Sequence, residues 1–301
     1  MIEVISLISI FLSAVVVSLL LTFPVVWLLI FFKVGQPVRE EGPSSHKEKA
    51  GTPTMGGIGF VLAIIILSLI LINIEFNPPY TALILLTLAF AAIGLADDLI
   101  KVVRRKNMGL TFWQKIFFQI AAAGLFSVFL GGNILFLLFA TFVIVGSANA
   151  TNLTDGLNGL LAGTAGIAFL SFAVLAGKLN APEAAVFSLI CSGAVFSFLY
   201  FNFPRAKVFM GDVGSLATGA ALAGLAVILH KELLLIVIGG VFVIEALSVI
   251  IQVASYKLFK RRIFKMAPLH HHFELMGFKE TAIVISFWVA ALVLGVAGAW
   301  I

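Results

Sequence analysis

The four aspartates of this sequence are the residues best suited to chemistry. Asp97 and Asp98 are adjacent, Asp155 lies in a stretch rich in Asn and Gly, and Asp212 lies between glycines. Neighbouring carboxylates repel each other unless a cation neutralises them, and Mg²⁺ prefers hard oxygen ligands that it shares with phosphates. We therefore expect these four aspartates to be catalytic residues around one divalent cation. For the adjacent pair, the structural alternative is a solvated helix end next to a basic loop.

The stretch from Asn149 to Gly159 reads Asn-Ala-Thr-Asn-Leu-Thr-Asp-Gly-Leu-Asn-Gly and lies between two apolar runs. It contains amide side chains at Asn152 and Asn158 as well as the carboxylate. Glycine allows a backbone to approach a ligand closely. Asn, Thr and Asp are also favoured in turns and helix caps, so an ordinary connector is the alternative. We expect a polar turn that forms part of a site.

The segment around Asp212 has the composition of a helix start that receives an anion. Gly211 and Gly214 flank the aspartate, and Ser215 follows. Free backbone N–H groups at a helix N-terminus point towards such a ligand. A simple N-cap is the alternative. Phe209, just upstream, could stack on a nucleotide base or anchor the chain at a membrane interface.

Three consecutive histidines, His270, His271 and His272, are the least common feature of the chain. Consecutive spacing suits a single metal ion poorly in comparison with a helical i, i+4 pair. We therefore expect them to hydrogen-bond phosphate and to stabilise charge in a basic loop. That loop also holds Arg261, Arg262 and Lys265.

Four further polar residues are candidates for binding. Lys49 and Thr54 lie in a polar, Gly- and Pro-rich loop that could wrap a ligand. Lys115 could contact a phosphate or act as an interfacial anchor. Glu245 lies inside an apolar run, where an ionisable residue is a functional-site hypothesis by default. The sequence indicates no partner for it.

The composition places these residues on a membrane protein. The chain has 301 residues, of which 61% are hydrophobic and 11% charged, and its mean hydropathy is +1.17. Soluble domains are about 25% charged. The single cysteine, Cys191, excludes an intramolecular disulfide and a zinc cluster of cysteines. The first apolar run, Val4 to Phe32, is too long for a cleavable leader and predicts a retained anchor.

The apolar runs predict an all-α fold with ten membrane-spanning helices in a single domain, residues 1–301. Lipid cannot satisfy backbone polar groups, and the runs are continuous rather than alternating, so they must be helices. The expected spans are Val4–Phe32, Met55–Ile74, Thr81–Ala96, Ile116–Leu130, Ile134–Ser147, Leu160–Gly177, Ala184–Phe201, Ser215–Leu229, Leu233–Tyr256 and Thr281–Ile301.

The distribution of charge predicts the orientation. With ten spans, one side receives 17 of the 19 Lys and Arg residues, and the other receives only Lys178 and Lys231. The basic side is then cytoplasmic and both termini are external. All four aspartates fall on the cytoplasmic side, where we expect the active site. The formal charge of +5 therefore indicates membrane orientation and not a nucleic-acid partner.

Two other classes of protein are weighed against an enzyme. A secondary transporter would use Glu245 and the glycine-rich spans, but transporters usually place their site near the bilayer midplane, often with internal repeats. A non-enzymatic scaffold would leave the one-sided aspartates and the histidines unexplained. We therefore favour a membrane enzyme that acts on phosphates.

Together these motifs resemble the polyprenyl-phosphate N-acetylhexosamine-1-phosphate transferase family over nearly the whole chain. The motifs are His46-Lys-Glu-Lys49-Ala-Gly-Thr-Pro-Thr54-Met-Gly-Gly57, Asp97-Asp98-x-x-Lys101, Asn152-Leu-Thr-Asp155-Gly-Leu-Asn158-Gly, Phe209-Met-Gly-Asp212 and Ala267-Pro-Leu-His-His-His-Phe-Glu274. The last is similar to the muramoyl branch of the family. Asn158 departs from the pattern, because the family usually has aspartate there.

The resemblance implies a reaction in which UDP-N-acetylmuramoyl-pentapeptide and undecaprenyl phosphate give lipid I and UMP. It also implies Mg²⁺ as cofactor, a homodimer, and a place in the bacterial cytoplasmic membrane with the active site facing the cytoplasm. A transferase of UDP-N-acetylglucosamine is the alternative within the family. Direct transfer and a route through an aspartyl-phosphate both stay open.

The resemblance also implies roles for individual residues. Asp212 and Asn152 are metal ligands, and Asp155 completes the polar shell. Asp97 or Asp98 prepares the lipid phosphate. The remaining groups bind substrate: Lys49, Thr54, Lys101 and Lys115 near phosphate, Gly156, Leu157, Asn158 and Phe209 near uracil, and His270, His271 and His272 near the diphosphate or sugar.

Overall fold

The structure is a computed structural model that describes residues 4–32, 35, 51–72, 77–104 and 108–301. Within these residues the regular secondary structure is helical, turns and loops join the helices, and one isolated bridge links Gly35 and Pro53. The helices are α1 (Val4–Phe31), α2 (Gly57–Leu71), α3 (Pro78–Arg104), α4 (Phe112–Leu130), α5 (Ile134–Thr154), α6 (Leu160–Lys178), α7 (Pro182–Asn202), α8 (Gly211–Ile228), α9 (Glu232–Ile238), α10 (Gly240–Phe259), α11 (Leu269–Leu275) and α12 (Glu280–Trp300). The all-α prediction is confirmed.

Most of the predicted membrane spans are present as long apolar helices. In the described part of the chain, nine helices are long and apolar enough to cross a membrane, and α2 is a shorter apolar helix. At 1.5 Å per residue, the 15 residues of α2 extend about 22 Å, which is less than the roughly 30 Å of a bilayer core. The protein is therefore a multi-pass membrane protein.

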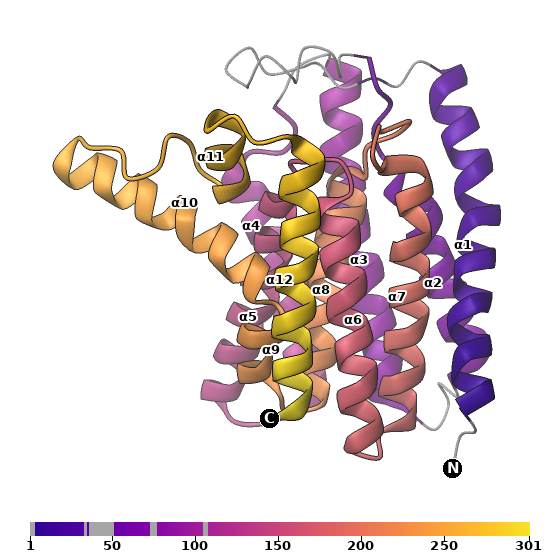
Figure 1. Ribbon diagram of the computed structural model, residues 1–301. Coiled ribbons are helices and arrows are strands. Elements are labelled where there is room, and N and C mark those ends of the chain that lie inside the picture. The colour runs from indigo at the N-terminus through magenta and orange to yellow at the C-terminus, as the bar shows by residue number, and fades with distance from the viewer. Residues whose placement is uncertain (1–3, 33–34, 36–50, 73–76, 105–107) are drawn as a thin grey trace.

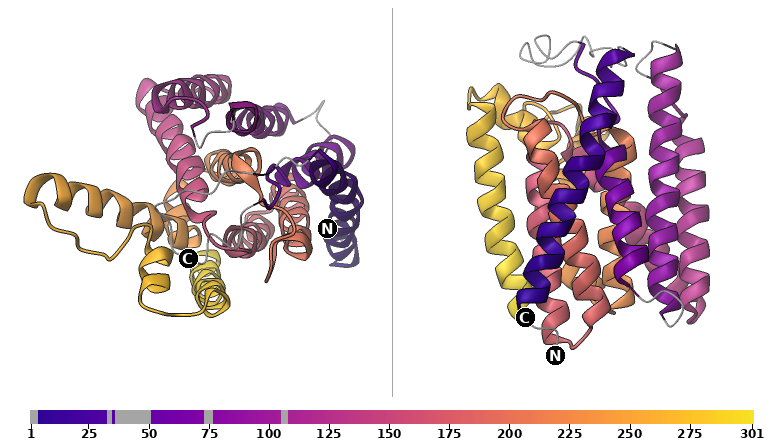
Figure 2. Two further views of the ribbon diagram at one scale, coloured as in Figure 1. Left: turned by 90° about the horizontal axis from the view of Figure 1, so that it is seen from above. Right: turned by 90° about the vertical axis from the view of Figure 1, so that its right-hand side faces the viewer.

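The helices form a bundle around α8, which is buried along most of its length (Figures 1 and 2). This helix is rich in Gly and Ala, and small residues allow membrane helices to approach closely. A Cβ on Gly94 of α3 would collide with the backbone oxygen of Asp212 on α8. The close crossing of α3 and α8 places the aspartates of the two helices side by side.

Two helices extend further than the sequence predicted. The third span was expected to end at Ala96, but α3 continues through Asp97 and Asp98 to Arg104. The Lys101 ammonium pairs with the Asp97 carboxylate one turn away. Basic side chains in the last turn also interact favourably with the helix dipole, which stabilises the extended helix. Likewise α5 continues to Thr154, so the amides at 149 and 152 are helical and only the residues after 154 form the turn.

The ninth predicted span is divided. The expected continuous helix from Leu233 to Tyr256 is broken at Gly239 into α9 and α10. Two adjacent glycines at this point, Gly239 and Gly240, make a helix break inexpensive. Beyond the break, α10 leaves the bundle at a steep angle, and α11 lies on the returning chain (Figure 1).

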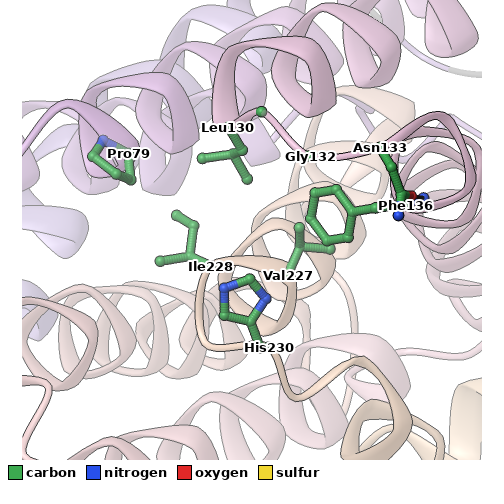
Figure 3. A pocket seen from close by; sticks show the side chains of 9 residues that line it. Pro79, Leu130, Gly132, Asn133, Phe136, Val227, Ile228 and His230 are labelled. Atoms are coloured by element: carbon green, nitrogen blue, oxygen red, sulfur yellow. Dashed lines mark hydrogen bonds between the residues drawn. The ribbon is translucent and has the colours of Figure 1, made fainter.

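A pocket of about 420 Å³ lies far from the aspartates (Figure 3). Pro79 at its edge begins α3, 18 residues before Asp97, which corresponds to about 27 Å of helix. Its lining is mainly apolar and includes no acidic side chain: Pro79, Leu130, Gly131, Gly132, Asn133, Phe136, Val227, Ile228 and His230. The pocket is not part of the aspartate site.

Candidate active site

Three of the four aspartates form one cluster where α3 meets the start of α8. Ligand oxygens of Asp97, Asp98 and Asp212 all lie within 4.8 Å of one another. Asp97 and Asp98 are buried, and Asp212 is half-buried. The prediction that carboxylates far apart in the sequence converge is confirmed for these three residues.

Two lysines offset most of the negative charge of the cluster. The Lys101 Nζ lies 2.6 Å from Asp97 Oδ2 and 3.1 Å from Asp212 Oδ2. The Lys115 Nζ, from α4, lies 2.6 Å from the same Asp212 oxygen. Three carboxylates and two ammonium groups leave one formal negative charge in the cluster. The cluster could therefore accept a divalent cation, and a lysine could leave it to contact a phosphate.

Backbone N–H groups hold the two α3 carboxylates. The Val213 N–H donates to Asp98 Oδ2 at 3.1 Å, and the Leu110 N–H donates to Asp97 Oδ1 at 2.8 Å. Gly211 has φ +77°, and a Cβ there would lie 2.5 Å from Asp98 Oδ2. Glycine is therefore required at this turn, both for its conformation and for the close approach.

Asn152 reaches the cluster from α5. Its Nδ2 donates to Asp212 Oδ1 and to Ser215 Oγ, both at 2.8 Å. The amide nitrogen of Asn152 therefore faces Asp212, because a carboxylate oxygen accepts a hydrogen bond and only the nitrogen can donate one. The metal-ligand role expected for Asn152 stays a prediction, because it requires the amide oxygen to turn towards the ion.

The cluster fits a divalent cation that prefers oxygen. It supplies carboxylates from two helices, and among the described residues Asp98 Oδ1 is buried without a hydrogen bond, its ion-pair contact being the Lys101 Nζ at 3.8 Å. A buried polar atom without a partner is costly, and a bound cation would satisfy it. Mg²⁺ is a hard cation that suits such oxygen ligands and keeps waters for phosphates.

Asp155 lies beside this cluster and outside it. The residue ends α5 and is half-buried. Burial raises the pKa of its carboxyl well above the usual value, and the negative charges of Asp212 and Asp98 raise this pKa further. The role of Asp155 in completing the polar shell of the site stays a prediction.

The turn after Asp155 is held from several sides. The Asn158 N–H donates to Glu280 Oε1 at 2.8 Å, and the Gly159 N–H donates to Asn202 Oδ1 at 2.6 Å. The Trp288 Nε1–H donates to the Gly159 carbonyl at 3.1 Å. These contacts come from α7 and α12, so the turn is a fixed structure and not a loose connector.

Two of the residues expected to contact uracil are buried, and one of them makes a hydrogen bond within the protein. Leu157 and Asn158 are buried. The Asn158 Nδ2 donates to the Pro204 carbonyl at 3.2 Å. An ionised aspartate could not make this bond, because it has no donor. The departure from the family pattern thus has a structural role, and uracil contact by Asn158 stays a prediction.

The three histidines lie on α11 and not in a loop, which corrects the sequence-based expectation. Their side chains point to different partners. His270 is fully buried and contacts Glu245, whereas His271 Nδ1 lies 2.6 Å from Glu274 Oε2. His272 Nδ1 lies 3.1 Å from the Lys265 N–H. Glu245, which had no partner in the sequence analysis, therefore has one in His270. The acid in an apolar run was visible in the sequence, but its partner was not.

The remaining candidates surround the start of α8. The Phe209 N–H donates to the Pro53 carbonyl at 2.8 Å, which joins this segment to the chain before α2. Thr54 is buried, and its hydroxyl has no hydrogen-bond partner among the described residues. Lys49 lies outside the described residues. Substrate binding by these three residues stays a prediction.

Comparison with known proteins identifies the family. Residues 80–230, which include all four aspartates, match the model described as glycosyl transferase family 4. A phospho-N-acetylmuramoyl-pentapeptide-transferase of Bacillus subtilis (strain 168) is 45% identical over 305 residues, covering 95% of this chain and 94% of the relative. A protein of the same name from Staphylococcus epidermidis (strain ATCC 12228) is 45% identical over 312 residues, covering 95% and 97%. The chain belongs to the phospho-N-acetylmuramoyl-pentapeptide-transferase family.

A third member of this transferase family, from Bacillus pumilus (strain SAFR-032), is 45% identical over 289 residues and covers 89% of each chain. The long alignments show that the likeness extends over nearly the whole chain. They therefore confirm the family that the motifs indicated, and they confirm its muramoyl branch.

Proposed function

We propose that this protein transfers phospho-N-acetylmuramoyl-pentapeptide from its UDP derivative to undecaprenyl phosphate, which produces lipid I and UMP. The observation that carries the proposal is the cluster of Asp97, Asp98 and Asp212, flanked by two lysines, in a chain of this transferase family. The site combines carboxylates for a divalent cation with ammonium groups for phosphates, which is the chemistry that phosphoryl transfer requires.

The position of the cluster supports a reaction between a soluble and a lipid-held substrate. It lies at the start of α8 and near the end of α3, about 27 Å along that helix from its first residues. Two phosphate-bearing substrates of this kind can meet only at a membrane surface. The alternation of spans along the sequence assigns 17 of the 19 Lys and Arg residues to the same side as the aspartates, so we place the site at the cytoplasmic face of the bacterial cytoplasmic membrane.

In the proposed reaction, Asp212 with Asp97 and Asp98 would hold Mg²⁺, and the ion would supply positive charge that offsets the negative charge of a diphosphate. The chain's own groups prepare the acceptor. Asp97 or Asp98 orients the lipid phosphate or removes its proton. Lys101 and Lys115 exchange their Asp212 contacts for phosphate oxygens, to which their ammonium groups donate.

The turn and α11 bind the nucleotide sugar in this proposal. Gly156, Leu157 and Asn158 border the uracil, together with Phe209, whose ring can stack on a base. The histidines contact the diphosphate or the sugar. Support for this arrangement comes from the packing of His270 against Gly156, which joins α11 to the turn.

The proposal also includes a homodimer. It rests on the family resemblance alone, because apolar side chains on the outer helices of a membrane protein also face lipid. Light scattering with correction for bound detergent tests it. A monomer at all protein concentrations in mild detergent would contradict it.

The reaction is tested with purified protein, labelled UDP-N-acetylmuramoyl-pentapeptide and undecaprenyl phosphate in detergent with Mg²⁺. We expect lipid I and UMP from the wild-type protein, and a loss of at least about 100-fold in Asp212→Asn. Glu183→Gln, a matched acid-to-amide change at the opposite end of the bundle, should keep wild-type turnover. Failure of the folded wild-type protein to release UMP would overturn the proposal, and preference for UDP-N-acetylglucosamine would redirect it.

A further inference from the structure

Glu245 and His270 form a fully buried pair at the base of α11. Glu245 Oε2 lies 3.0 Å from His270 Nδ1, and Glu245 Oε1 accepts a hydrogen bond from the His270 backbone N–H at 3.2 Å. Both side chains are completely buried. A carboxylate with two contacts to the same residue fixes both the position of the backbone and the rotation of the ring.

The pair joins elements that are separate in the fold. Glu245 lies on α10, just beyond the break at Gly239, whereas His270 lies on α11. An ionisable group at membrane depth is costly unless it is paired. The contact therefore ties the start of α11 to the first turns of α10, where that helix is still against the bundle (Figure 1).

The other ring nitrogen of His270 has no partner among the described residues. Nε2 is buried without a hydrogen bond, and a Cβ added to Gly156 would collide with it. The nitrogen therefore points at the backbone of the turn that begins with Asp155. Only glycine at position 156 leaves room for the ring in this orientation.

We propose that Glu245 is a positioning residue that holds the His270 ring with Nδ1–H directed to the carboxylate and Nε2 directed to the substrate beside Gly156. The proposal rests on the transferase function proposed above. As negative charge develops on the diphosphate of the nucleotide sugar in the transition state, Nε2–H donates to one of its oxygens. The Glu245 carboxylate balances the charge of the ring, as an orienting acid does for other histidines with a catalytic or ligand-binding role.

The test compares three variants of the full-length protein in detergent. Glu245→Gln keeps the shape but removes the charge, and it places an amide NH₂ group against one of the two His270 groups, the backbone N–H or the ring Nδ1, that contact the Glu245 carboxylate. Glu245→Asp keeps the charge on a shorter side chain. Ser248→Ala is the matched control, because Ser248 is buried one turn later on α10 and its hydroxyl donates to the Glu245 carbonyl.

We expect Glu245→Gln to lower kcat by at least about tenfold, with less than about threefold change in KM for the nucleotide sugar. Glu245→Asp should retain more activity than Glu245→Gln, and Ser248→Ala should stay within about twofold of wild type. Equal loss in Glu245→Gln and Ser248→Ala, or a better rescue by Gln than by Asp, would overturn the positioning role.

Nitrogen NMR of ¹⁵N-histidine-labelled protein provides a measurement that does not depend on turnover. The His270 Nδ1 and Nε2 shifts, assigned by their loss in His270→Asn, should change in Glu245→Gln and stay unchanged in Ser248→Ala. If the His270 nitrogen shifts are unchanged in Glu245→Gln, the positioning role is wrong even if the protein is an active transferase. If the shifts change as expected but the wild-type protein has no transferase activity, only the proposed function is wrong. If Glu245→Gln does not fold, Gly156→Ala serves in its place, and unchanged Nε2 shifts in that variant overturn the geometry.

Discussion

The carboxylate of Asp212 contacts two ammonium groups and one amide group. One of its oxygens lies within 3.1 Å of both Lys101 Nζ and Lys115 Nζ, and the other accepts a hydrogen bond from Asn152. In the proposed reaction, a divalent cation and the two ammonium groups would compete for the same carboxylate. Metal binding and phosphate binding would then be linked, because each lysine displaced from Asp212 becomes free to hold a phosphate oxygen.

Lys115→Met is expected to separate these two effects. Loss of one ammonium group should tighten binding of Mn²⁺, used as a probe for Mg²⁺, by about tenfold, because a nearby positive charge disfavours the ion. The same change should lower transferase activity through loss of a phosphate contact. Electron paramagnetic resonance of free Mn²⁺ measures the affinity without turnover. Weaker Mn²⁺ binding in this variant would contradict competition at Asp212.

Asp155 predicts a pH dependence of stability. Its raised pKa means that the folded protein favours the protonated carboxyl. The associated stability is present below the unfolded pKa of about 3.9 and is lost as pH rises through the folded pKa. In metal-free protein, Asp155→Asn should therefore raise Tm at pH 8, and the gain should shrink towards acid pH. Thermal unfolding in detergent measures this, and a gain that grows towards acid pH would reverse the assignment.

At the scale of the element, the approach of α3 to α8 sets the geometry of the site. Gly94 lies three residues before Asp97, and no side chain fits between it and the backbone of Asp212. Packing this close depends on the absence of a single Cβ. The spacing of the carboxylates is thus set by a residue that carries no chemistry itself.

Gly94→Ala should destabilise the protein by about 1–3 kcal/mol through overpacking. It should also lower activity, because α3 and α8 must separate where the carboxylates meet. Gly124→Ala and Gly146→Ala are matched controls on α4 and α5, since nothing lies within 4 Å of a Cβ at either position. Both should be neutral or slightly stabilising, because alanine favours a helix. Equal Tm values for all three variants would show that the crossing is looser than described.

The sequence predicted the helices better than it predicted their ends. Apolar runs show where lipid surrounds the chain, so the spans were found, but they do not show where a helix stops. Asp97 was expected at a helix end because it is charged, yet its ion pair with Lys101 lets α3 continue. The break at Gly239 was missed because the apolar residues on both sides of it are continuous.

Convergence of the aspartates was predictable, because the sequence sorts all four to one side of the membrane. Contacts that depend on tertiary packing were not. Neither the pairing of Glu245 with His270 nor the bond from Asn158 to the Pro204 carbonyl leaves a local pattern in the sequence. The partners in these contacts are 25 and 46 residues apart.

For the whole molecule, the charge pattern of the sequence and the arrangement of the helices both place the chain ends and the site at opposite ends of the bundle. The start of α1 and the end of α12 lie at the same end of the bundle, which agrees with the even number of spans, ten, predicted from the sequence (Figure 1). The lysines and aspartates of the site lie towards the other end. The orientation inferred from charge therefore makes a simple accessibility prediction.

Single cysteines at Lys265 and Lys178 should label from opposite sides of the membrane. Both positions are exposed, and the native Cys191 is fully buried, so it provides little background. In right-side-out spheroplasts, a membrane-impermeant maleimide should react with Lys178→Cys, whereas Lys265→Cys should react only after permeabilisation. The wild-type protein is the control for Cys191. The reverse pattern would place the active site outside the cell.

The anchoring of the 155–159 turn by α12 has a consequence for biosynthesis. Trp288 and Glu280, which hold this turn, belong to the helix that follows all the others. A ribosome-bound chain that has inserted its first eight spans already contains every aspartate, yet the turn beside them still lacks those supports. The turn therefore gains these contacts late, and we expect incomplete translation products left in the membrane to lack its final structure.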